Sequence, residues 1–319
     1  MDSTAVRSPV PQVDVVIPAR NEEYALASTI DQVRDALSGG ACKLRFIVVD
    51  DGSTDATWST ITDIQRRTGT NITAVRLSRR FGKDAAIMAG LAQSRGDVAV
   101  TIDADGQHPP AVIATMLELW KSGADVVNGM KAVRAEDSLR QRATAVIFNW
   151  LFRSLTRLDF AGASDFKLLD RSVVRALLDC GDYHVFYRAL VLWVGFRQVA
   201  MPFDVSPATR ESRWTARALL LLSINAIVMF SDLPIYFLLA AGLATLVLCA
   251  VLMIILLARY FTGPVPIGYP TLLVLQLATL SLTVTAVGAI GLYVRAALAQ
   301  SRARPRHIVR ALVSTEDLH

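Results

Sequence analysis

The first 130 residues alternate between short apolar runs and stretches whose apolar positions recur at helical spacing. The apolar runs cover residues 13–18, 44–49, 72–77, 98–102 and 124–128. Between the first two runs, apolar residues recur every three or four positions from Leu26 to Leu37, as on one face of a helix. Strands that alternate with helices in this way predict an α/β domain with a mainly parallel sheet and right-handed crossovers.

The pattern resumes after a less regular stretch. Residues 165–170 indicate a short strand, residues 171–178 a helix, and residues 195–201 the last strand of the domain. Residues 138–158 mix arginines with large apolar side chains, which fits either a basic amphipathic helix at a membrane surface or a core-facing helix with solvated arginines. We expect this domain to cover residues 1–209.

Apolar segments dominate the chain from residue 210 onward. Arg213, Trp214 and Arg217 precede an apolar stretch at 218–230, which predicts an interfacial amphipathic helix within 210–232. Two uncharged runs follow at about 234–258 and 271–294, and each exceeds the roughly 20 residues that cross a bilayer core. Residues 233–294 are therefore expected to form a hairpin of two transmembrane helices.

Charge around this hairpin predicts its orientation. The connector at 260–270 carries no charge, whereas residues 295–319 form a tail rich in arginine. The positive-inside rule then predicts a multi-pass protein of the inner or plasma membrane, with the N-terminal domain and both termini cytoplasmic. The first dozen residues lack the apolar core of a signal peptide, in keeping with this orientation. Gly288 and Gly291 could pack against a helix of another copy, which would give a homo-oligomer.

Composition supports a membrane protein and disfavours several other classes. The hydrophobic fraction is 53% and the mean hydropathy is +0.40, both high for a soluble protein. Lys and Arg exceed Asp and Glu by 33 to 28, without the basic and aromatic interleaving that would indicate a nucleic-acid partner. Cys42, Cys180 and Cys249 show no paired spacing, so neither a disulfide framework nor a zinc site is indicated.

The clearest candidate chemistry follows the fourth apolar run, where the chain reads DADGQHPP at 103–110. Ligands of open α/β sheets bind at the carboxyl ends of the strands. Asp103 and Asp105 would present hard oxygen ligands there for Mg²⁺ or Mn²⁺, with His108 a weaker candidate. A turn without a ligand is the alternative, because Asp and Gly are also ordinary loop residues. The absence of G-x-G-x-x-G after the first strand removes the main support for a dinucleotide site.

Several stretches together resemble the family 2 glycosyltransferases. Within that family they are most similar to the polyprenol-phosphate glycosyltransferases, such as bactoprenol glucosyltransferase and dolichol-phosphate mannose synthase. The matching stretches are VVIPARNEE, VVDDGSTDAT, LSRRFGKDAAIMAGL, DADGQHPP, DFKLLDRSVV and RESRW, followed by the apolar hairpin. Each stretch alone is a weak signal, but together they span nearly the whole chain.

The resemblance implies a nucleotide-binding GT-A-like fold and an inverting enzyme. The enzyme would transfer one sugar from a nucleotide sugar, with UDP as the first expectation, to a polyprenyl phosphate such as undecaprenyl phosphate. The implied donor-binding residues are Pro18, Ala19, Asn21, Glu22, Asp50, Asp51, Lys83 and Asp103. The implied ligands of Mg²⁺ or Mn²⁺ are Asp103, Asp105 and Gln107. The implied phosphate or acceptor contacts are Lys131, Arg140, Arg142, Arg213, Trp214 and Arg217.

The implied reaction needs little base catalysis, because a phosphate monoester has a second pKa near 6 and is already anionic at neutral pH. Asp103, Asp105 and Asp165 are the expected catalytic residues, with Asp165 a weak base or a group one step removed from the substrate. A strand-end Asp in a turn is the alternative for Asp165. The chain departs from its relatives at Arg80, where Asn is common, and at Pro207 and Arg210 ahead of the RESRW stretch.

Two other functions remain open on the sequence. One is dolichol-type mannosyl transfer from GDP-mannose, since the residues do not specify the donor base. The other is a non-catalytic membrane scaffold that binds a nucleotide, which the presence of both Asp103 and Asp105 disfavours.

Overall fold

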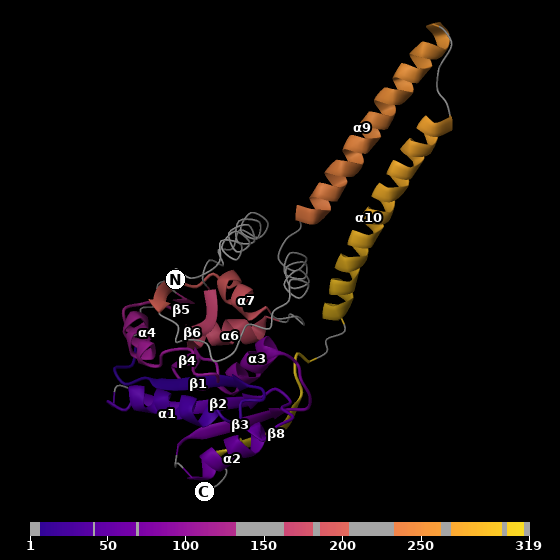
Figure 1. Cartoon of the computed structure of the whole chain (residues 1–319). Coiled ribbons are helices and arrows are strands. Elements are labelled where there is room, and N and C mark those ends of the chain that lie inside the picture. The colour runs from indigo at the N-terminus through magenta and orange to yellow at the C-terminus, as the bar shows by residue number, and fades with distance from the viewer. Residues whose placement is uncertain are drawn as a thin grey trace, which may run out of the picture. The chain divides into compact units, whose positions relative to one another are not determined.

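The structure is a computed structural model. It describes residues 7–40, 42–67, 70–131, 163–180, 186–203, 233–262, 269–301 and 305–315. The chain divides into two compact units, one built around a β-sheet and one containing two long helices (Figure 1).

A sheet of eight strands organises the first unit, in the order β7-β5-β6-β4-β1-β2-β3-β8. The strands are β1 (Gln12–Ala19), β2 (Lys43–Asp50), β3 (Ile72–Leu77), β4 (Val98–Thr101), β5 (Val126–Lys131), β6 (Ala163–Asp170), β7 (Gln198–Phe203) and β8 (Val309–Ser314). Pairs β1–β2, β1–β4, β2–β3 and β5–β7 are parallel, and β4–β6, β5–β6 and β3–β8 are antiparallel. The predicted α/β fold with a mixed, mostly parallel sheet is confirmed.

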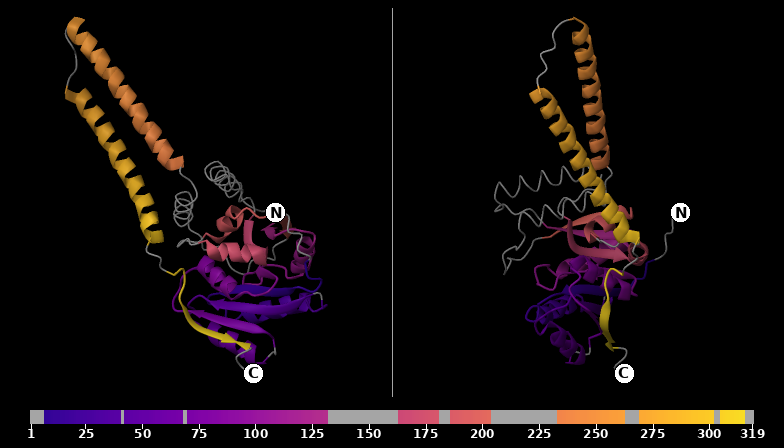
Figure 2. Two further views of the ribbon diagram at one scale, coloured as in Figure 1. Left: turned by 180° about the vertical axis from the view of Figure 1, so that it is seen from behind. Right: turned by 90° about the vertical axis from the view of Figure 1, so that its right-hand side faces the viewer.

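Helices cover both faces of the sheet (Figure 2). One face packs against α1 (Leu26–Ala36), α2 (Thr57–Arg67) and α4 (Ala111–Lys121), and the other against α3 (Lys83–Gln93), α6 (Arg171–Asp179) and α7 (Tyr187–Trp193). Side chains alternate along β1, with Val15 and Ile17 in one core and Val16 in the other. Burial on both faces explains why the central strands are nearly continuous apolar runs. The sequence patterns did not predict α7.

The antiparallel pairing of β6 with β4 determines where the polar residues meet. Thr101 lies opposite Lys167 in the register of the two strands. Asp103 lies two residues beyond Thr101, just past the end of β4, and Asp165 lies two residues before Lys167 on β6. The register therefore brings Asp165 to the edge of the sheet at which β4 ends. Asp165 lies inside β6 rather than at a strand end, because β6 begins at Ala163.

A C-terminal strand completes the sheet. We expected residues 195–201 to be the last strand and 295–319 to be a basic tail, but β8 lies within that tail and pairs with β3. A strand does form near 195–201, as β7, but the expectation that it is the last strand was wrong. Thr315 fastens the end of β8, because its hydroxyl accepts from the N–H of Ile72 and donates to the Ile72 carbonyl, both at 2.9 Å. Strand β8 has only six residues and a weak strand pattern in its sequence, so it forms a strand because it pairs with the free edge of β3.

The second unit contains α9 (Leu233–Thr262) and α10 (Tyr269–Ser301), which contact each other (Figure 2). Within the described residues, one stretch, Leu275–Val294, is long and apolar enough to cross a membrane, and a shorter apolar stretch covers Ile235–Thr245. One such helix is consistent with a membrane anchor. The two-span topology and the domain limits stay predictions, and the predicted helices at 138–158 and 218–230 lie outside the described residues.

A buried carboxylate holds together the end of the sheet where β1 begins. Asp14 is fully buried and accepts two hydrogen bonds from Arg45, at 2.8 and 2.6 Å. Its second oxygen also accepts from the Ser94 hydroxyl and from the N–H groups of Arg95 and Gly96. Burial alone would raise the pKa of Asp14, but these hydrogen bonds outweigh burial and lower that pKa.

We predict that Asp14→Asn lowers the free energy of unfolding by about 3 kcal/mol, because Arg45 would keep a buried charge without a counter-charge. Urea unfolding of the full chain in detergent measures the change. Glu118→Gln is the control, since it removes only an exposed ion pair with Lys121 and should cost less than about 1 kcal/mol.

The same substitution should alter acid sensitivity. The contribution of Asp14 is present above its unfolded pKa of about 4 and is lost as pH falls through the lower folded pKa. The wild type should therefore lose stability relative to Asp14→Asn as pH falls below about 4. Equal stability of the two proteins at neutral pH would contradict the role assigned to Asp14.

Candidate active site

A pocket of about 250 Å³ lies where strands β1, β2 and β4 end. Its lining residues come from the end of β1, from the loops after β1, β2, β3 and β4, and from the start of α3. They are Pro18, Ala19, Arg20, Glu22, Asp51, Arg80, Gly82, Lys83, Ala86, Asp103, Ala104 and Asp105. This is the edge at which open α/β sheets bind ligands, as the sequence predicts.

The loops after β1 and β2 are tied to each other by hydrogen bonds. The Asn21 side-chain oxygen accepts from the N–H of Thr54 at 2.9 Å, and the Asn21 N–H donates to the Ser53 hydroxyl at 3.1 Å. Asn21 has a φ of 57°, a left-handed conformation that Asn adopts more readily than most residues. Asn21 is not among the residues that line the described pocket, so its described contacts position a loop.

The two acidic residues at the end of β2 have different surroundings. Asp50 is fully buried, accepts from the N–H of Ser53 at 2.8 Å and pairs with Arg76 at 3.3 Å. Asp51 lines the pocket and accepts from the N–H groups of Phe81 and Gly82 at 2.6 and 3.0 Å. Burial raises the pKa of Asp51, and the two N–H groups oppose that shift only in part. Asp51 thus connects the β2 loop to the loop before α3.

Gly52 allows the β2 loop to approach the neighbouring loop closely. Its φ is 64°, and a Cβ at this position would lie 2.6 Å from the main-chain carbon of Arg79. A larger residue here would push the two loops apart.

Three side chains after β4 form a candidate metal centre. Ligand atoms of Asp103, Asp105 and His108 lie within 4.8 Å of one another. His108 is buried, with its ring 5.1 Å from Phe166 and 5.5 Å from Phe203. Two carboxylates and an imidazole suit Mn²⁺, and the carboxylates also suit Mg²⁺, so the donor set fits a divalent cation.

His108, the weaker candidate from the sequence, therefore lies with the two carboxylates, whereas the family resemblance implies Gln107 as the third ligand. The N–H of Gln107 donates to the Asp105 carboxylate at 3.1 Å. The candidates for the third ligand are therefore His108 and Gln107, and the ligand roles stay predictions.

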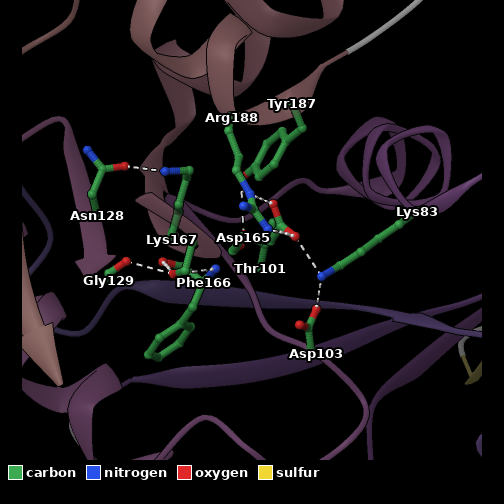
Figure 3. A network of polar contacts seen from close by, with 11 residues as sticks. Lys83, Thr101, Asp103, Asn128, Gly129, Asp165, Phe166, Lys167, Tyr187 and Arg188 are labelled. Carbon is green, nitrogen blue, oxygen red and sulfur yellow. Dashed lines mark hydrogen bonds and ion pairs between the residues drawn. The ribbon is translucent and has the colours of Figure 1, made fainter. Parts of the chain in front are cut away.

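A chain of alternating charges extends from the metal centre into the protein (Figure 3). The Lys83 ammonium lies 2.6 Å from Asp103 and 2.6 Å from Asp165. Arg188 grips Asp165 with two hydrogen bonds at 2.6 and 2.8 Å. Burial alone would raise the pKa of Asp165, but Arg188 and Lys83 hold it well below its usual range. Asp165 is therefore an anion that positions Lys83, and it is a poor proton acceptor.

Two further ionisable groups lie close to this chain. Burial, reinforced by the Asp165 charge, raises the pKa of Asp84 to about 6. Burial lowers the pKa of Lys167 to about 7, and its amine donates to the Asn128 side chain at 2.5 Å. Thr101 donates to the Asp165 carbonyl and lies 3.0 Å from the Tyr187 hydroxyl. These contacts attach α7 to the strands beneath it.

Sequence reasoning missed Arg188, Lys167 and Tyr187. Arg188 is the one charged residue of the otherwise apolar stretch 186–194, and an isolated charge in such a stretch was a usable signal. Lys167 lies in DFKLLD, two residues from Asp165 and thus on the same face of β6. No local pattern indicated their partners, because those contacts come from other strands and helices.

The structure places the predicted site residues differently, with Asp165 in β6 beside Lys83 and Gln107 beside Asp105. Pro18, Ala19, Glu22, Asp51, Lys83, Asp103 and Asp105 line the pocket, whereas Asn21 and Asp50 hold its loops. Lys131 ends β5 and its side chain is not described. Arg140, Arg142, Arg213, Trp214 and Arg217 lie outside the described residues.

Comparison with known families defines the class of this fold and site. The model of glycosyl transferase family 2 matches residues 14–178, slightly more than half of the chain. The chain belongs to glycosyl transferase family 2, as its motifs predict. The match covers β1 to α6 and includes the candidate metal centre.

Relatives extend the similarity over almost the whole chain. The uncharacterized glycosyltransferase sll0501 of Synechocystis sp. is 30% identical over 311 residues, covering 96% of this chain and 97% of the relative. The undecaprenyl-phosphate 4-deoxy-4-formamido-L-arabinose transferase of Serratia proteamaculans is 28% identical, covering 98% of this chain and 97% of the relative. The similarity to a polyprenol-phosphate glycosyltransferase includes the region of the long helices.

A solved structure shares the fold over about two thirds of the chain. The glucosyl-3-phosphoglycerate synthase of Mycobacterium tuberculosis, solved with Mn²⁺, UDP-glucose and phosphoglyceric acid, superposes with a TM-score of 0.50 at 21% identity. The superposition covers 68% of this chain and 78% of that protein. At this identity the likeness establishes the fold alone.

The tie between the β1 and β2 loops leads to a prediction at Asn21. Asn21→Gly keeps the left-handed backbone but loses the acceptor for Thr54, whereas Asn21→Asp keeps both. We expect Asn21→Gly to weaken UDP or GDP binding by about tenfold, because it removes roughly one hydrogen bond that positions the loop. Asn21→Asp should bind the nucleotide nearly as the wild type does. Calorimetric titration of the nucleotide measures this, and wild-type affinity in Asn21→Gly would show that the tie does not shape the pocket.

Proposed function

We propose that this protein transfers a single sugar, with inversion, from a nucleotide sugar to a polyprenyl phosphate such as undecaprenyl phosphate. The observation that carries the proposal is the pocket at the carboxyl edge of the sheet, which places Asp103 and Asp105 together beside Lys83. Near full-length similarity to an undecaprenyl-phosphate sugar transferase supports the choice of acceptor.

The donor is assigned to the pocket. The nucleoside lies against Pro18, Ala19, Glu22 and Asp51, and Asn21 and Asp50 hold the surrounding loops. The diphosphate extends toward Asp103, because the carboxylates there suit a divalent cation that a diphosphate also binds. A uridine donor is our first choice, and guanosine is the alternative.

Asp103, Asp105 and either His108 or Gln107 would hold Mg²⁺ or Mn²⁺. Bound there, the divalent cation would neutralise charge on the leaving diphosphate. Lys83, an ammonium on the same carboxylate, supplies a second positive charge on the pocket wall.

The acceptor needs no strong base, since its phosphate is already anionic at neutral pH. Asp165 fits this requirement, because its pKa is held low by Arg188 and Lys83 and it stays charged. We therefore assign Asp165 the role of a positioning residue one step removed from the substrate, rather than that of a weak base.

The acceptor side involves basic residues whose side chains the structure does not describe. Lys131, Arg140 and Arg142 are assigned to phosphates, and Arg213, Trp214 and Arg217 to the lipid headgroup at the membrane surface. Arg grips phosphate with a planar fork and Trp prefers the headgroup level, so both residue types suit a lipid phosphate.

A transfer assay tests the function. Purified protein, undecaprenyl phosphate and a panel of labelled UDP and GDP sugars should yield one lipid-linked sugar, identified by mass spectrometry. A product only from GDP-mannose would replace the uridine donor, and no product from any donor would favour the non-catalytic scaffold.

Metal dependence provides the sharper prediction. EDTA, Asp103→Asn and Asp105→Asn should each lower turnover by at least about 100-fold, the usual range for loss of a group that stabilises transition-state charge. Comparison of Gln107→Ala with His108→Ala identifies the third ligand as the variant with the larger loss. Full turnover of folded Asp103→Asn would contradict the metal assignment.

We further propose that both ends of the helical hairpin face the cytoplasm, because the predicted connector is uncharged and the tail is basic. A single cysteine at Ile267, in a protein whose three native cysteines are replaced, should react with an impermeant reagent only from the periplasmic or external side of sealed vesicles. Labelling only from the cytoplasmic side would exclude this topology.

A further inference from the structure

Lys83 lies between two carboxylates, one from the loop after β4 and one from β6. Its ammonium is 2.6 Å from Oδ1 of Asp103 and 2.6 Å from Oδ2 of Asp165 (Figure 3). Asp103 is also one of the three side chains assigned to the divalent cation. The Asp103 carboxylate is therefore a partner both of the Lys83 ammonium and of the proposed divalent cation.

We propose that Lys83 is an internal counter-cation that competes with the divalent cation for Asp103, so that tight metal binding requires the donor diphosphate. This inference rests on the proposed metal site. The competition holds whichever oxygen of Asp103 the metal uses, because an ammonium on one oxygen lies only a few ångström from a cation on the other.

Asp165 gives Lys83 a second partner during this exchange. Two hydrogen bonds from Arg188 fix the orientation of Asp165, so one of its oxygens stays directed at Lys83. The Lys83 side chain remains 42% exposed and lines the pocket. A flexible four-carbon side chain can leave Asp103 for a diphosphate oxygen while it remains near Asp165. The diphosphate thereby frees Asp103 for the metal.

The charges around Lys83 predict effects of opposite sign. Asp84, Asp103 and Asp165 contribute carboxylates, and Lys83 and Arg188 contribute cations. Loss of the Lys83 charge leaves the centre more negative and should strengthen metal binding. Loss of the Asp165 charge leaves Lys83 with Asp103 alone and leaves Arg188 uncompensated, so it should weaken metal binding.

Binding of Mn²⁺ alone to the full chain in detergent tests the proposal, with free Mn²⁺ measured by electron paramagnetic resonance. Lys83→Met should lower the Kd for Mn²⁺ by about tenfold, as expected for removal of a nearby like charge. Lys83→Arg, which keeps a cation, should bind as the wild type does, and Asp165→Asn should bind more weakly. Lys121→Met removes a lysine from an ion pair on α4 and should leave the Kd unchanged.

A second arm adds UDP or GDP as the diphosphate. Either nucleotide should strengthen Mn²⁺ binding more in the wild type than in Lys83→Met, because only the wild type has an ammonium to displace. Lys83→Gln repeats the neutral substitution in case the methionine variant fails to fold, and the unfolding midpoint of each variant is measured beside its Kd.

Equal or weaker Mn²⁺ binding in both neutral variants, relative to the wild type, would overturn the competition while leaving the metal site intact. Failure of every protein to bind Mn²⁺, with or without nucleotide, would instead overturn the metal site and the competition with it. The two failures are therefore distinguishable.

Discussion

Compensation of negative charge at one edge of the sheet is the constraint on which the site depends. The antiparallel pairing of β6 with β4 brings Asp165 to the edge where Asp103 follows β4. Carboxylates that converge in a partly buried site repel one another unless cations lie between them. Lys83 from α3 and Arg188 from α7 supply those cations, so helices on one face of the sheet organise the chemistry at its edge.

The two ends of the sheet carry polar clusters of different kinds, one with fixed partners and one whose partners can change. At the start of β1, Asp14 has its charge and hydrogen bonds fully satisfied by Arg45 and the loop at 94–96. At the other end, Lys83 is shared between two carboxylates and remains partly exposed. The first cluster is suited to stability, and the second is suited to exchange partners when an anionic ligand arrives.

The sequence predicted those features that local patterns determine. Short apolar runs followed by acidic residues placed Asp103 and Asp105 at a strand end, and the motifs named Lys83. Features that depend on contacts distant in the sequence were not predictable. Strand β8 is stabilised by β3, more than 200 residues away in the sequence. The role of Arg188 follows only from its hydrogen bonds to Asp165. The resemblance named Asn21 and Asp50 but not their partners, which show that both hold loops.

The central claim is that a divalent cation binds at the end of β4 when a diphosphate is present. Anomalous diffraction, or an equivalent high-resolution map, of the full chain with Mn²⁺ and UDP or GDP tests it most directly. We predict a Mn²⁺ ion within about 2.2 Å of oxygen atoms of Asp103 and Asp105, as hard divalent cations bind carboxylates, with the Lys83 ammonium on the diphosphate. Mn²⁺ bound to the diphosphate without contact to either carboxylate would contradict the account.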